Sequence, residues 1–336
     1  MVTAVTGATG HVGNVLVREL VRRGDSVRAV VLPGEATAPI DGLAVELVPG
    51  DVRDRASLER AFRGAELVFH LAGIVTIRSG QARLLDEVNV RGTMNVVEAC
   101  RLAGVRRLVY TSSVHALVEP PHGTPVRETE GFEPDRLLGD YARSKARASI
   151  EVLEGVRQGL DAVLVYPSGI IGPFDYRPSE MGQLVLDFTL RRLPAYIDGE
   201  YDFVDVRDVA QGLLAAAGQG RRGRGYLLSG HRISVAALLR MLHGLTSVRA
   251  PRFKLPRWLA LAAAAFAPAY SRITRSRPLF TSYSIKVLGS NCLMCRDRAE
   301  QELGFRARPL LETMSQTVEW FRAVGRLPAA CTVRGQ

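Results

Sequence analysis

Two kinds of hydrophobic pattern alternate along the first 166 residues. Short, nearly continuous apolar runs are typical of strands buried on both faces, and they occur at residues 2–5, 26–32, 44–48, 66–71, 107–112 and 162–166. Between them, apolar residues spaced three and four positions apart predict helices at residues 14–23, 56–62, 84–103 and 139–156. This alternation predicts an α/β fold, a Rossmann-type doubly wound parallel sheet, over residues 1–166.

The pattern is less regular in the second half of the chain. Helical spacing remains readable at residues 180–191, 206–217, 235–245 and 310–324. We expect residues 167–330 to form a smaller, mainly substrate-binding lobe. Some of its segments, at about residues 200–217, should return to the core of the first domain.

Composition narrows the class of protein. The chain has 336 residues, of which 47% are hydrophobic, a mixture typical of a globular protein. No run of 18 uncharged apolar residues predicts a spanning helix, and the first apolar run is too short for a signal peptide. Four cysteines in a chain of this length indicate no disulfide scaffold, so a cytoplasmic location is expected. The pair Cys292 and Cys295 lacks further ligand residues of metal-site spacing, so no metal site is predicted.

The charge is unevenly distributed. The chain carries a net charge of +10, yet residues 209–296 contain fourteen basic and no acidic residues. Within this stretch, residues 258–267 are apolar and are flanked by arginines. Two interpretations stay open: a helix buried in the substrate lobe, or peripheral contact with the inner face of an anionic membrane. No nucleic-acid recognition motif accompanies the charge, so nucleic acid is not an expected partner.

A glycine-rich turn joins the first strand to the first helix. It reads Thr6-Gly-Ala-Thr-Gly-His-Val-Gly13, a GxxGxxG pattern. Its first glycine permits a tight turn, the second permits approach of a pyrophosphate, and the third permits close packing of helix on strand. The turn predicts a dinucleotide site. The candidate cofactor contacts are Gly7, Thr9, Gly10, His11, Val12 and Gly13.

The end of the second strand should distinguish NAD from NADP. An acid there accepts a hydrogen bond from the ribose 2′-hydroxyl of NAD, whereas an arginine favours the 2′-phosphate of NADP. This chain has Val31 and Leu32 at these positions, which are neither. The cofactor is therefore predicted to be NADP or NAD, with a slight preference for NADP.

Tyr141 and Lys145 form a YxxxK pair on one face of a predicted helix. A tyrosine with its ordinary pKa near 10 is a weak acid–base catalyst at neutral pH, and a neighbouring ammonium lowers that pKa. Lys145 is one of only three lysines in a chain with 41 arginines, which indicates that the compact ammonium matters here. The fifth strand ends in Ser112 and Ser113, where a hydroxyl could hydrogen-bond a substrate oxygen.

With these elements, the chain resembles the extended short-chain dehydrogenases/reductases, the NAD-dependent epimerase/dehydratase superfamily. Further matching segments are Gly50-Asp-Val52, His70-Leu-Ala-Gly73, Asn89-Val-Arg-Gly-Thr-Met-Asn95 and Phe203-Val-Asp-Val-Arg-Asp-Val-Ala210. The resemblance implies a catalytic set of Ser113, Tyr141 and Lys145. It also implies further cofactor contacts at Asp51, Val52, Leu71, Ala72, Gly73, Tyr141, Lys145, Pro167 and Ile170.

The segment from Tyr166 to Phe174 bears on the reaction. In nucleotide-sugar epimerases and dehydratases the matching segment carries an Asn that contacts the sugar-nucleotide diphosphate; here that residue is Gly169. The segment is more similar to dihydroflavonol reductases and 3β-hydroxysteroid dehydrogenases. We therefore expect hydride transfer to or from a secondary alcohol, ketone or aldehyde of a bulky apolar substrate. A nucleotide-sugar epimerase or dehydratase and a non-catalytic dinucleotide sensor are the alternatives, and a homodimer is left open.

Overall fold

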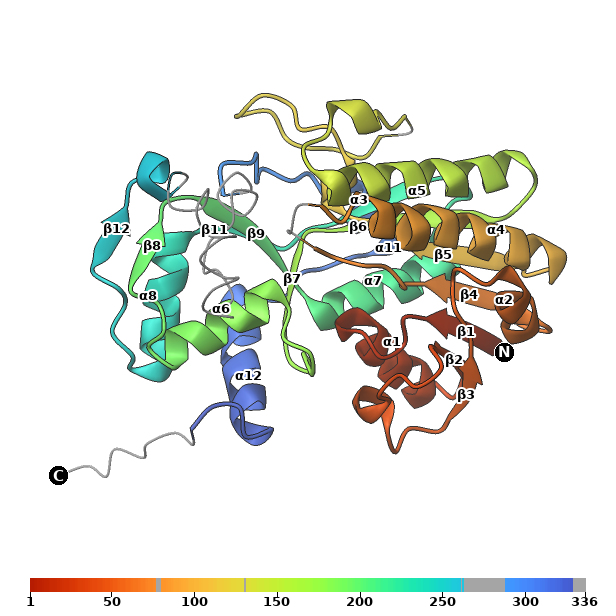
Figure 1. Ribbon diagram of the computed structural model, residues 1–336, viewed down its shortest axis with the longest axis horizontal. Helices are drawn as coiled ribbons and strands as arrows, with labels where there is room; N and C mark the ends of the chain where they lie inside the picture. The colour runs from red at the N-terminus through yellow and green to blue at the C-terminus, as the bar shows by residue number, and fades with distance from the viewer. Residues whose placement is uncertain (77–79, 130, 261, 263–287, 329–336) are drawn as a thin grey trace.

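The computed structural model describes residues 1–76, 80–129, 131–260, 262 and 288–328. Its larger part is a seven-stranded parallel sheet with the strand order β10-β6-β5-β4-β1-β2-β3 (Figure 1). The strands are β1 (Val2–Thr6), β2 (Ser26–Val31), β3 (Val45–Pro49), β4 (Leu67–His70), β5 (Arg107–Thr111), β6 (Ala162–Pro167) and β10 (Gly225–Leu228). The predicted Rossmann-type fold is thus confirmed.

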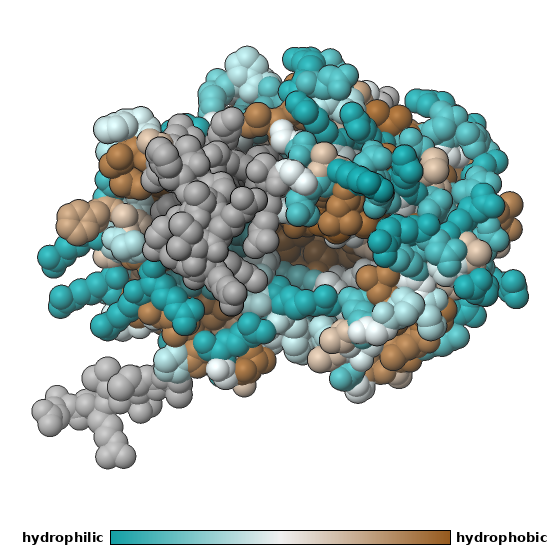
Figure 2. Space-filling view, viewed as in Figure 1, coloured by the Kyte–Doolittle hydropathy of each residue, from teal (hydrophilic) through white to brown (hydrophobic). Residues whose placement is uncertain are grey.

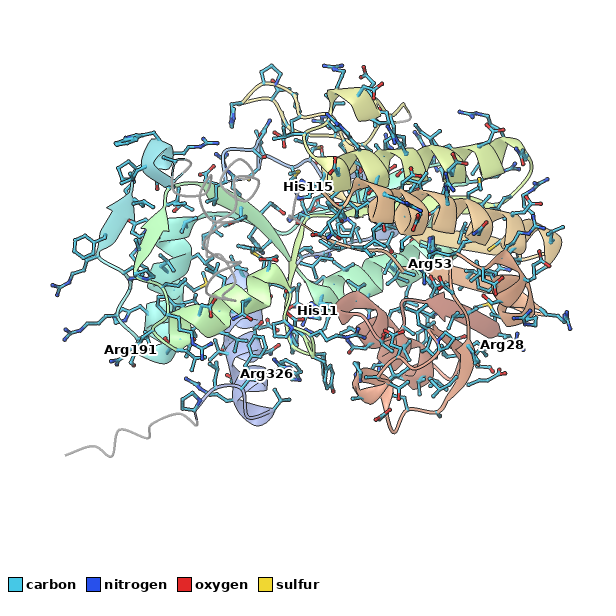
Figure 3. All side chains as sticks on the ribbon, viewed as in Figure 1. His11, Arg28, Arg53, His115, Arg191 and Arg326 are labelled. Atoms are coloured by element: carbon cyan, nitrogen blue, oxygen red, sulfur yellow. The ribbon has the colours of Figure 1, made fainter. Side chains whose placement is uncertain are left out.

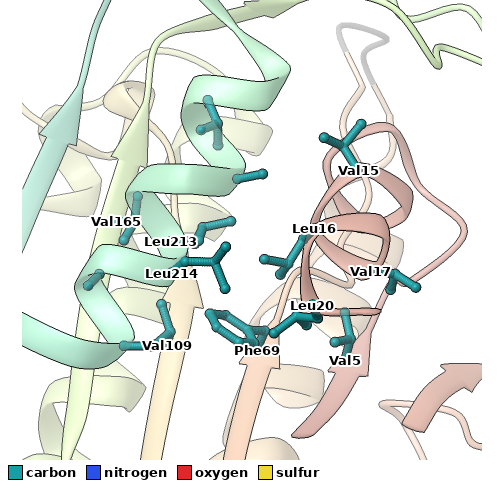
Figure 4. Close-up of a cluster of buried hydrophobic side chains, with 14 of the residues drawn as sticks. Val5, Val15, Leu16, Val17, Leu20, Phe69, Val109, Val165, Leu213 and Leu214 are labelled. Atoms are coloured by element: carbon teal, nitrogen blue, oxygen red, sulfur yellow. The ribbon is translucent and has the colours of Figure 1, made fainter. Parts of the chain in front are cut away.

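Helices cover both faces of this sheet. On one face lie α1 (His11–Arg22), α7 (Val206–Gln219) and α11 (Asp297–Leu303), and on the other lie α2 (Arg55–Phe62), α4 (Gly92–Leu102) and α5 (Asp140–Arg157). Successive strand residues point to opposite faces: Val5 packs in the cluster under α1 and α7, and Ala4 in the cluster under α2, α4 and α5. Figure 4 shows the first of these clusters, where Leu16 of α1 faces Leu213 of α7 above Phe69. Burial on both faces explains why the inner strands read as continuous apolar runs. The run expected at residues 44–48 differs, because β3 lies at the edge of the sheet and none of its residues is buried.

Residues after β6 build a second lobe around its own core. Its strands are β7 (Gly169–Ile171), β8 (Ala195–Ile197), β9 (Glu200–Asp205), β11 (His231–Ser234) and β12 (Phe253–Leu255). Its helices are α6 (Glu180–Thr189), α8 (Val235–Thr246) and α12 (Leu310–Ala323). Apolar side chains of the three helices pack against β7 and β9 in one cluster. The segment that packs on the larger sheet comprises α7 and β10, residues 206–228, and α11.

The long helix expected at residues 84–103 is built from three pieces. It starts as α3 (Ala82–Leu85), continues through a π-helical turn η2 (Asp86–Arg91) and ends as α4. Short 3₁₀ turns are present at η1 (Ala38–Ile40), η3 (Val114–Ala116) and η4 (Pro134–Arg136). Across the described ranges, every helix falls short of the length and apolar character needed to cross a membrane.

Candidate active site

The glycine turn between β1 and α1 leaves no room for side chains. Gly7 has a φ of 69°, and a Cβ on it would lie 2.7 Å from the backbone nitrogen of Ala72. A Cβ on Gly13 would lie 2.0 Å from the carbonyl oxygen of Gly7. Both glycines are therefore required for the turn to close against the end of β4 and against α1. The cradle has the form that a pyrophosphate needs, so the residues present fit a dinucleotide.

The start of α1 points into this cradle. Gly10 is the N-cap residue, and no side chain caps the helix. Backbone N–H groups at an uncapped helix N-terminus favour an anion. The His11 ring is engaged elsewhere, since its Nε2 lies 3.0 Å from the carbonyl oxygen of Pro173. Contact of His11 and Val12 with a phosphate would thus be made by their backbone.

The order of the strands reverses between β1 and β4. Ligands of such sheets bind beyond the carboxyl ends of the strands at this switch point. Leu71, Ala72 and Gly73 follow β4 at this place. The backbone N–H of Leu71 donates to the Thr6 carbonyl over 3.2 Å, so the turn stays attached to β1. A Cβ on Gly73 would lie 3.5 Å from Nζ of Lys145. The turn therefore joins the glycine cradle to the predicted catalytic residues.

Asp51 and Val52 lie just beyond β3, at the same edge of the sheet. The Arg53 side chain donates to both carboxylate oxygens of Asp51, and these bonds hold the pKa of Asp51 below its usual range. Val52 is buried against Gly92, and its carbonyl accepts a 2.8 Å hydrogen bond from Asn95. Asp51 is thus an ionised acceptor; its contact with the cofactor stays a prediction.

Tyr141 and Lys145 project from the first turns of α5 and both are buried. Nζ of Lys145 donates a 2.8 Å hydrogen bond to the carbonyl of Thr111, the last residue of β5, and lies 5.2 Å from the centroid of the Tyr110 ring. Burial lowers the pKa of Lys145 to about 8. The pair is thus fixed at the carboxyl edge of the sheet.

Ser113 follows β5 and faces the same region. Its hydroxyl accepts a 3.2 Å hydrogen bond from the backbone N–H of His115 and so caps η3. The ring of His115 lies edge-on to that of Tyr141, with 6.2 Å between their centroids. Burial lowers the pKa of His115, so this ring is uncharged at neutral pH. Ser112 is engaged behind the site, 2.8 Å from the hydroxyl of Ser149.

Pro167 and Ile170 lie where the chain passes into the second lobe. Pro167 ends β6 beside Leu228 of β10, and Ile170 in β7 packs partly buried against the core shared by α1 and α7. Figure 3 shows His11 and His115 near this junction. Figure 2 shows a hollow with an apolar floor near the middle of the same face. The candidate site is therefore a cleft between the lobes.

Two polar residues of the site were missing from the sequence-based set. Asn89, in the π-helical turn, donates to Ser144 and to the carbonyl of Ile74 over 3.0 Å each, and accepts from the Ile74 N–H over 2.8 Å. It thereby ties the turn after Gly73 to the helix that carries Tyr141. Glu35, four residues after β2, lies against Thr9 of the glycine turn. The motif that contains Asn89 could have identified it, whereas no local pattern marks Glu35.

Known proteins resemble the chain over its whole length. It is 39% identical to sterol demethylase protein B of Methylococcus capsulatus over 97% of this chain and 100% of that protein. It is 33% identical to a putative dihydroflavonol 4-reductase of Synechocystis over 96% of this chain and 94% of the relative. The crystal structure of gox2253 matches with a TM-score of 0.85 and 34% identity, over 97% of this chain and 99% of that one.

A family description matches most of the chain as well. The NAD dependent epimerase/dehydratase family matches residues 3–229, from the first strand to the last strand of the large sheet. The resemblance expected from the motifs is thereby confirmed, together with relatives named for sterols and dihydroflavonols. The chain belongs to the NAD-dependent epimerase/dehydratase family, within the extended short-chain dehydrogenases/reductases.

Proposed function

We propose that this protein transfers a hydride reversibly between a nicotinamide and a secondary alcohol or ketone of a bulky apolar molecule, such as a steroid-, flavonoid- or isoprenoid-like compound. One observation carries the proposal. Tyr141 and a Lys145 that is bonded to the end of β5 lie together at the carboxyl edge of the sheet. The apolar floor of the hollow at the lobe junction fits an apolar substrate.

A nicotinamide bound in this site would supply or accept the hydride. The chain's own task is to hold and move the hydroxyl proton. Tyr141 donates it when a ketone is reduced and takes it when an alcohol is oxidised. The Lys145 ammonium, one helical turn from Tyr141, would stabilise the phenolate form of this tyrosine during proton transfer. Ser113 orients the substrate oxygen by a hydrogen bond.

The cofactor would be held by residues from both sides of the switch point. Backbone at Gly7, Gly10 and Gly13 would face the pyrophosphate, and Lys145 would bond the nicotinamide ribose. The other proposed cofactor contacts lie at or after the carboxyl ends of β1, β3, β4 and β6. They are Thr9, His11, Val12, Asp51, Val52, Leu71, Ala72, Gly73, Pro167 and Ile170.

Position 169 argues against a nucleotide-sugar substrate. A Cβ on Gly169 would lie 2.8 Å from the carbonyl oxygen of Asp202 and 3.2 Å from the ring of Phe203. No side chain fits there, so an Asn directed at a sugar-nucleotide diphosphate has no place at this position. A non-catalytic sensor is also disfavoured, because both Tyr141 and Lys145 are retained. The names of the two relatives, which refer to sterol and dihydroflavonol, support the same substrate class.

A screen of purified protein tests the function. Steroids, flavonoids, aldehydes and nucleotide sugars are each supplied with NAD, NADH, NADP or NADPH while absorbance at the reduced-nicotinamide band is followed. We expect net absorbance change with a bulky apolar alcohol or ketone, and its loss in Tyr141→Phe. Conversion of a nucleotide sugar without net absorbance change would favour the epimerase alternative instead.

We also propose that the outer end of the second lobe contacts an anionic membrane. Exposed apolar side chains lie in β12 and just after it: Phe253 is 76% exposed, Trp258 71% and Leu259 41%. β12 stands at the outer end of the lobe (Figure 1). Exposed Arg252 and Arg257 flank them, in a stretch without acids. Residues 261 and 263–287, with most of the apolar segment expected at 258–267, lie outside the described residues.

Aromatic side chains beside arginines suit the boundary of an anionic bilayer, where each basic residue contributes about 1 kcal/mol. Sedimentation with vesicles of phosphatidylserine or of phosphatidylcholine, at low and high salt, tests this. We expect binding to the anionic vesicles that weakens with salt. The double variant Phe253→Ser, Trp258→Ser should lose it. Leu102→Ser, which removes an apolar side chain 61% exposed on α4, should not. Binding that ignores lipid charge would contradict the proposal.

A further inference from the structure

The turn that follows β2 returns an acid toward the glycine turn. The backbone N–H of Glu35 donates to the Leu32 carbonyl over 3.0 Å, and the Leu32 N–H donates to Oε2 of Glu35 over 3.1 Å. On the other side, the Thr9 hydroxyl donates to Oε1 of Glu35. The end of β2 is apolar, but the turn after it places the Glu35 carboxylate beside the glycine turn between β1 and α1.

An arginine from the second lobe completes this group. Nη2 of Arg177 donates to Oε1 of Glu35 and to the Thr9 hydroxyl, over 2.9 Å each. Arg177 belongs to the segment between β7 and α6. Neighbouring residues of this segment hold α1: the carbonyl of Phe174 accepts from Asn14 over 3.2 Å, and Arg18 donates to the Tyr176 hydroxyl over 3.2 Å. The second lobe therefore reaches the glycine turn at several points.

The charge state of Glu35 follows from its surroundings. Burial by itself raises the pKa of Glu35, but hydrogen bonds from Arg177 and Thr9 outweigh it and leave the pKa below its usual range. The Glu35 side chain is 18% exposed and that of Arg177 is 62% exposed. Glu35 is thus a half-buried carboxylate, ionised at neutral pH and held in place by two side chains and one backbone N–H.

Position gives this carboxylate a role. In sheets of this kind the group beyond the second strand meets the adenosine ribose, and an acid there accepts from the 2′-hydroxyl. A 2′-phosphate at the same place would bring a second anion against Glu35, and like charges repel. Oε2 accepts only from the Leu32 backbone N–H among the described contacts, which leaves acceptor capacity for a ribose hydroxyl.

We propose that Glu35 selects NAD over NADP at the adenosine ribose, and that Arg177 of the second lobe is a positioning residue that holds Glu35 for this task. The inference rests on the proposed dinucleotide function and deepens it. It replaces the slight preference for NADP that the apolar strand end suggested. It also makes coenzyme selection depend on a residue outside the dinucleotide-binding domain, through the Arg177–Glu35 contact.

Equilibrium titration of the purified protein with NADH and with NADPH tests the proposal without a substrate. We expect the parent to bind NADH at least about tenfold more tightly than NADPH. Glu35→Gln should remove most of this ratio, because the amide neither repels a phosphate nor accepts as strongly. Arg177→Gln should lower the ratio of NADH to NADPH affinity by less than Glu35→Gln does. Arg177→Lys should keep more of this ratio than Arg177→Gln.

Two controls separate positioning from general damage. In the double variant of Glu35→Gln and Arg177→Gln, the arginine change should have little further effect on the ratio, since its target is gone. Arg28→Gln breaks a 2.8 Å ion pair between Arg28 of β2 and Glu46 of β3, on the side away from His11 (Figure 3), and should leave the ratio unchanged.

The possible results separate this inference from the proposed function. Failure of both coenzymes to bind the parent would overturn both. Equal binding of the two coenzymes, or tighter binding of NADPH by way of Arg177, would overturn only the selection by Glu35. An unchanged ratio in Glu35→Gln would do the same. An Arg177→Gln effect that persists in full without Glu35 would refute the positioning role.

Discussion

Nζ of Lys145 donates a 2.8 Å hydrogen bond to the backbone carbonyl of Thr111, and this bond ties α5 to the end of β5. Tyr141 precedes Lys145 by one helical turn, so the same bond fixes the height of the phenol over the sheet edge. Ser113 leaves the strand two residues after Thr111. One contact thus sets the relative positions of all three predicted catalytic residues, which are otherwise 28 or more positions apart between strand and helix.

Tyr141→Phe should lower kcat by at least about a hundredfold while the Kd for the reduced coenzyme stays within about threefold of the parent value. The reason is that the ring still fills its buried site but can no longer transfer a proton. Steady-state rates with the substrate found in the screen, together with coenzyme titration, measure both quantities.

Tyr226→Phe is the matched control, because it removes a phenolic hydroxyl of the outermost strand β10 that donates to Glu302 of α11. It should cost stability and leave kcat near that of the parent. Near-normal turnover of the Tyr141 variant would show that another group moves the proton.

The arrangement of the large domain could be predicted from sequence because its signals are local. Strands buried on both faces require continuous apolar runs, and the glycines are required by contacts within one βαβ unit. The expected strand at residues 107–112 is β5, at Arg107–Thr111, and the expected helix at 139–156 is α5, at Asp140–Arg157. The Tyr141 and Lys145 pair could also be predicted from the sequence, since their spacing alone places them on one helical face.

The helices of the second lobe were predicted at residues 180–191, 235–245 and 310–324 and are present as α6, α8 and α12. Its strand pairings and the long-range contacts of single side chains were not predictable in this way. β7, β8 and β12 have three residues each, too few for a periodic pattern, and their pairing partners are distant in sequence. Glu35 shows the same limit at one residue. The proposed role of Glu35 depends on its contacts with Thr9 and with Arg177, which is 142 positions away. No spacing rule connects these three residues.

Lys145→Met should remove a cost that the folded protein carries at neutral pH. Burial lowers the pKa of Lys145 to about 8, below the ordinary 10.5, so the buried ammonium opposes folding at pH 7. That cost disappears as pH rises through this interval, because the unfolded chain then binds more protons than the folded one. Denaturant titrations should therefore show the variant losing roughly 3 kcal/mol relative to the parent between pH 7 and pH 10.5.

Lys254→Met serves as the control, since Lys254 is exposed and paired with Asp198 over 2.7 Å. Its stability relative to the parent should show no such loss. The Lys145 variant should also be inactive at every pH. A stability difference that is flat between pH 7 and pH 10.5 would mean that Lys145 is not buried as a cation in the free protein.

Gly13→Ala should abolish coenzyme binding and lower the melting temperature. The new methyl group would lie 2.0 Å from the carbonyl oxygen of Gly7, so α1 and the glycine turn must separate. Gly218→Ala in α7 is the matched control, because a Cβ there meets nothing within 4 Å and alanine is favoured in a helix by up to about 1 kcal/mol. Coenzyme binding by the Gly13 variant within about threefold of the parent would contradict the assigned role of this turn.

His70 is buried between two hydroxyl groups. Its Nδ1 lies 2.8 Å from the Thr6 hydroxyl and its Nε2 lies 3.0 Å from that of Thr93. Burial, with a smaller effect of the Lys145 charge, lowers the pKa of His70 to about 3 from the ordinary 6.5. Between these values the unfolded chain takes up a proton that the folded chain refuses. The stability contributed by His70 is therefore complete above pH 6.5 and declines as pH falls toward 3.

His70→Asn keeps a polar side chain between Thr6 and Thr93 but cannot titrate, so it should lose less stability on acidification than the parent. The difference should reach roughly 3 kcal/mol between pH 7 and pH 4, measured by denaturant titration of both proteins at each pH. His122→Gln, at an exposed position, should follow the parent at both pH values. Equal acid sensitivity of the Asn variant and the parent would show that His70 is protonated in the folded protein. That result would reopen the question of whether an imidazolium, rather than the Lys145 ammonium alone, supplies positive charge beneath the site.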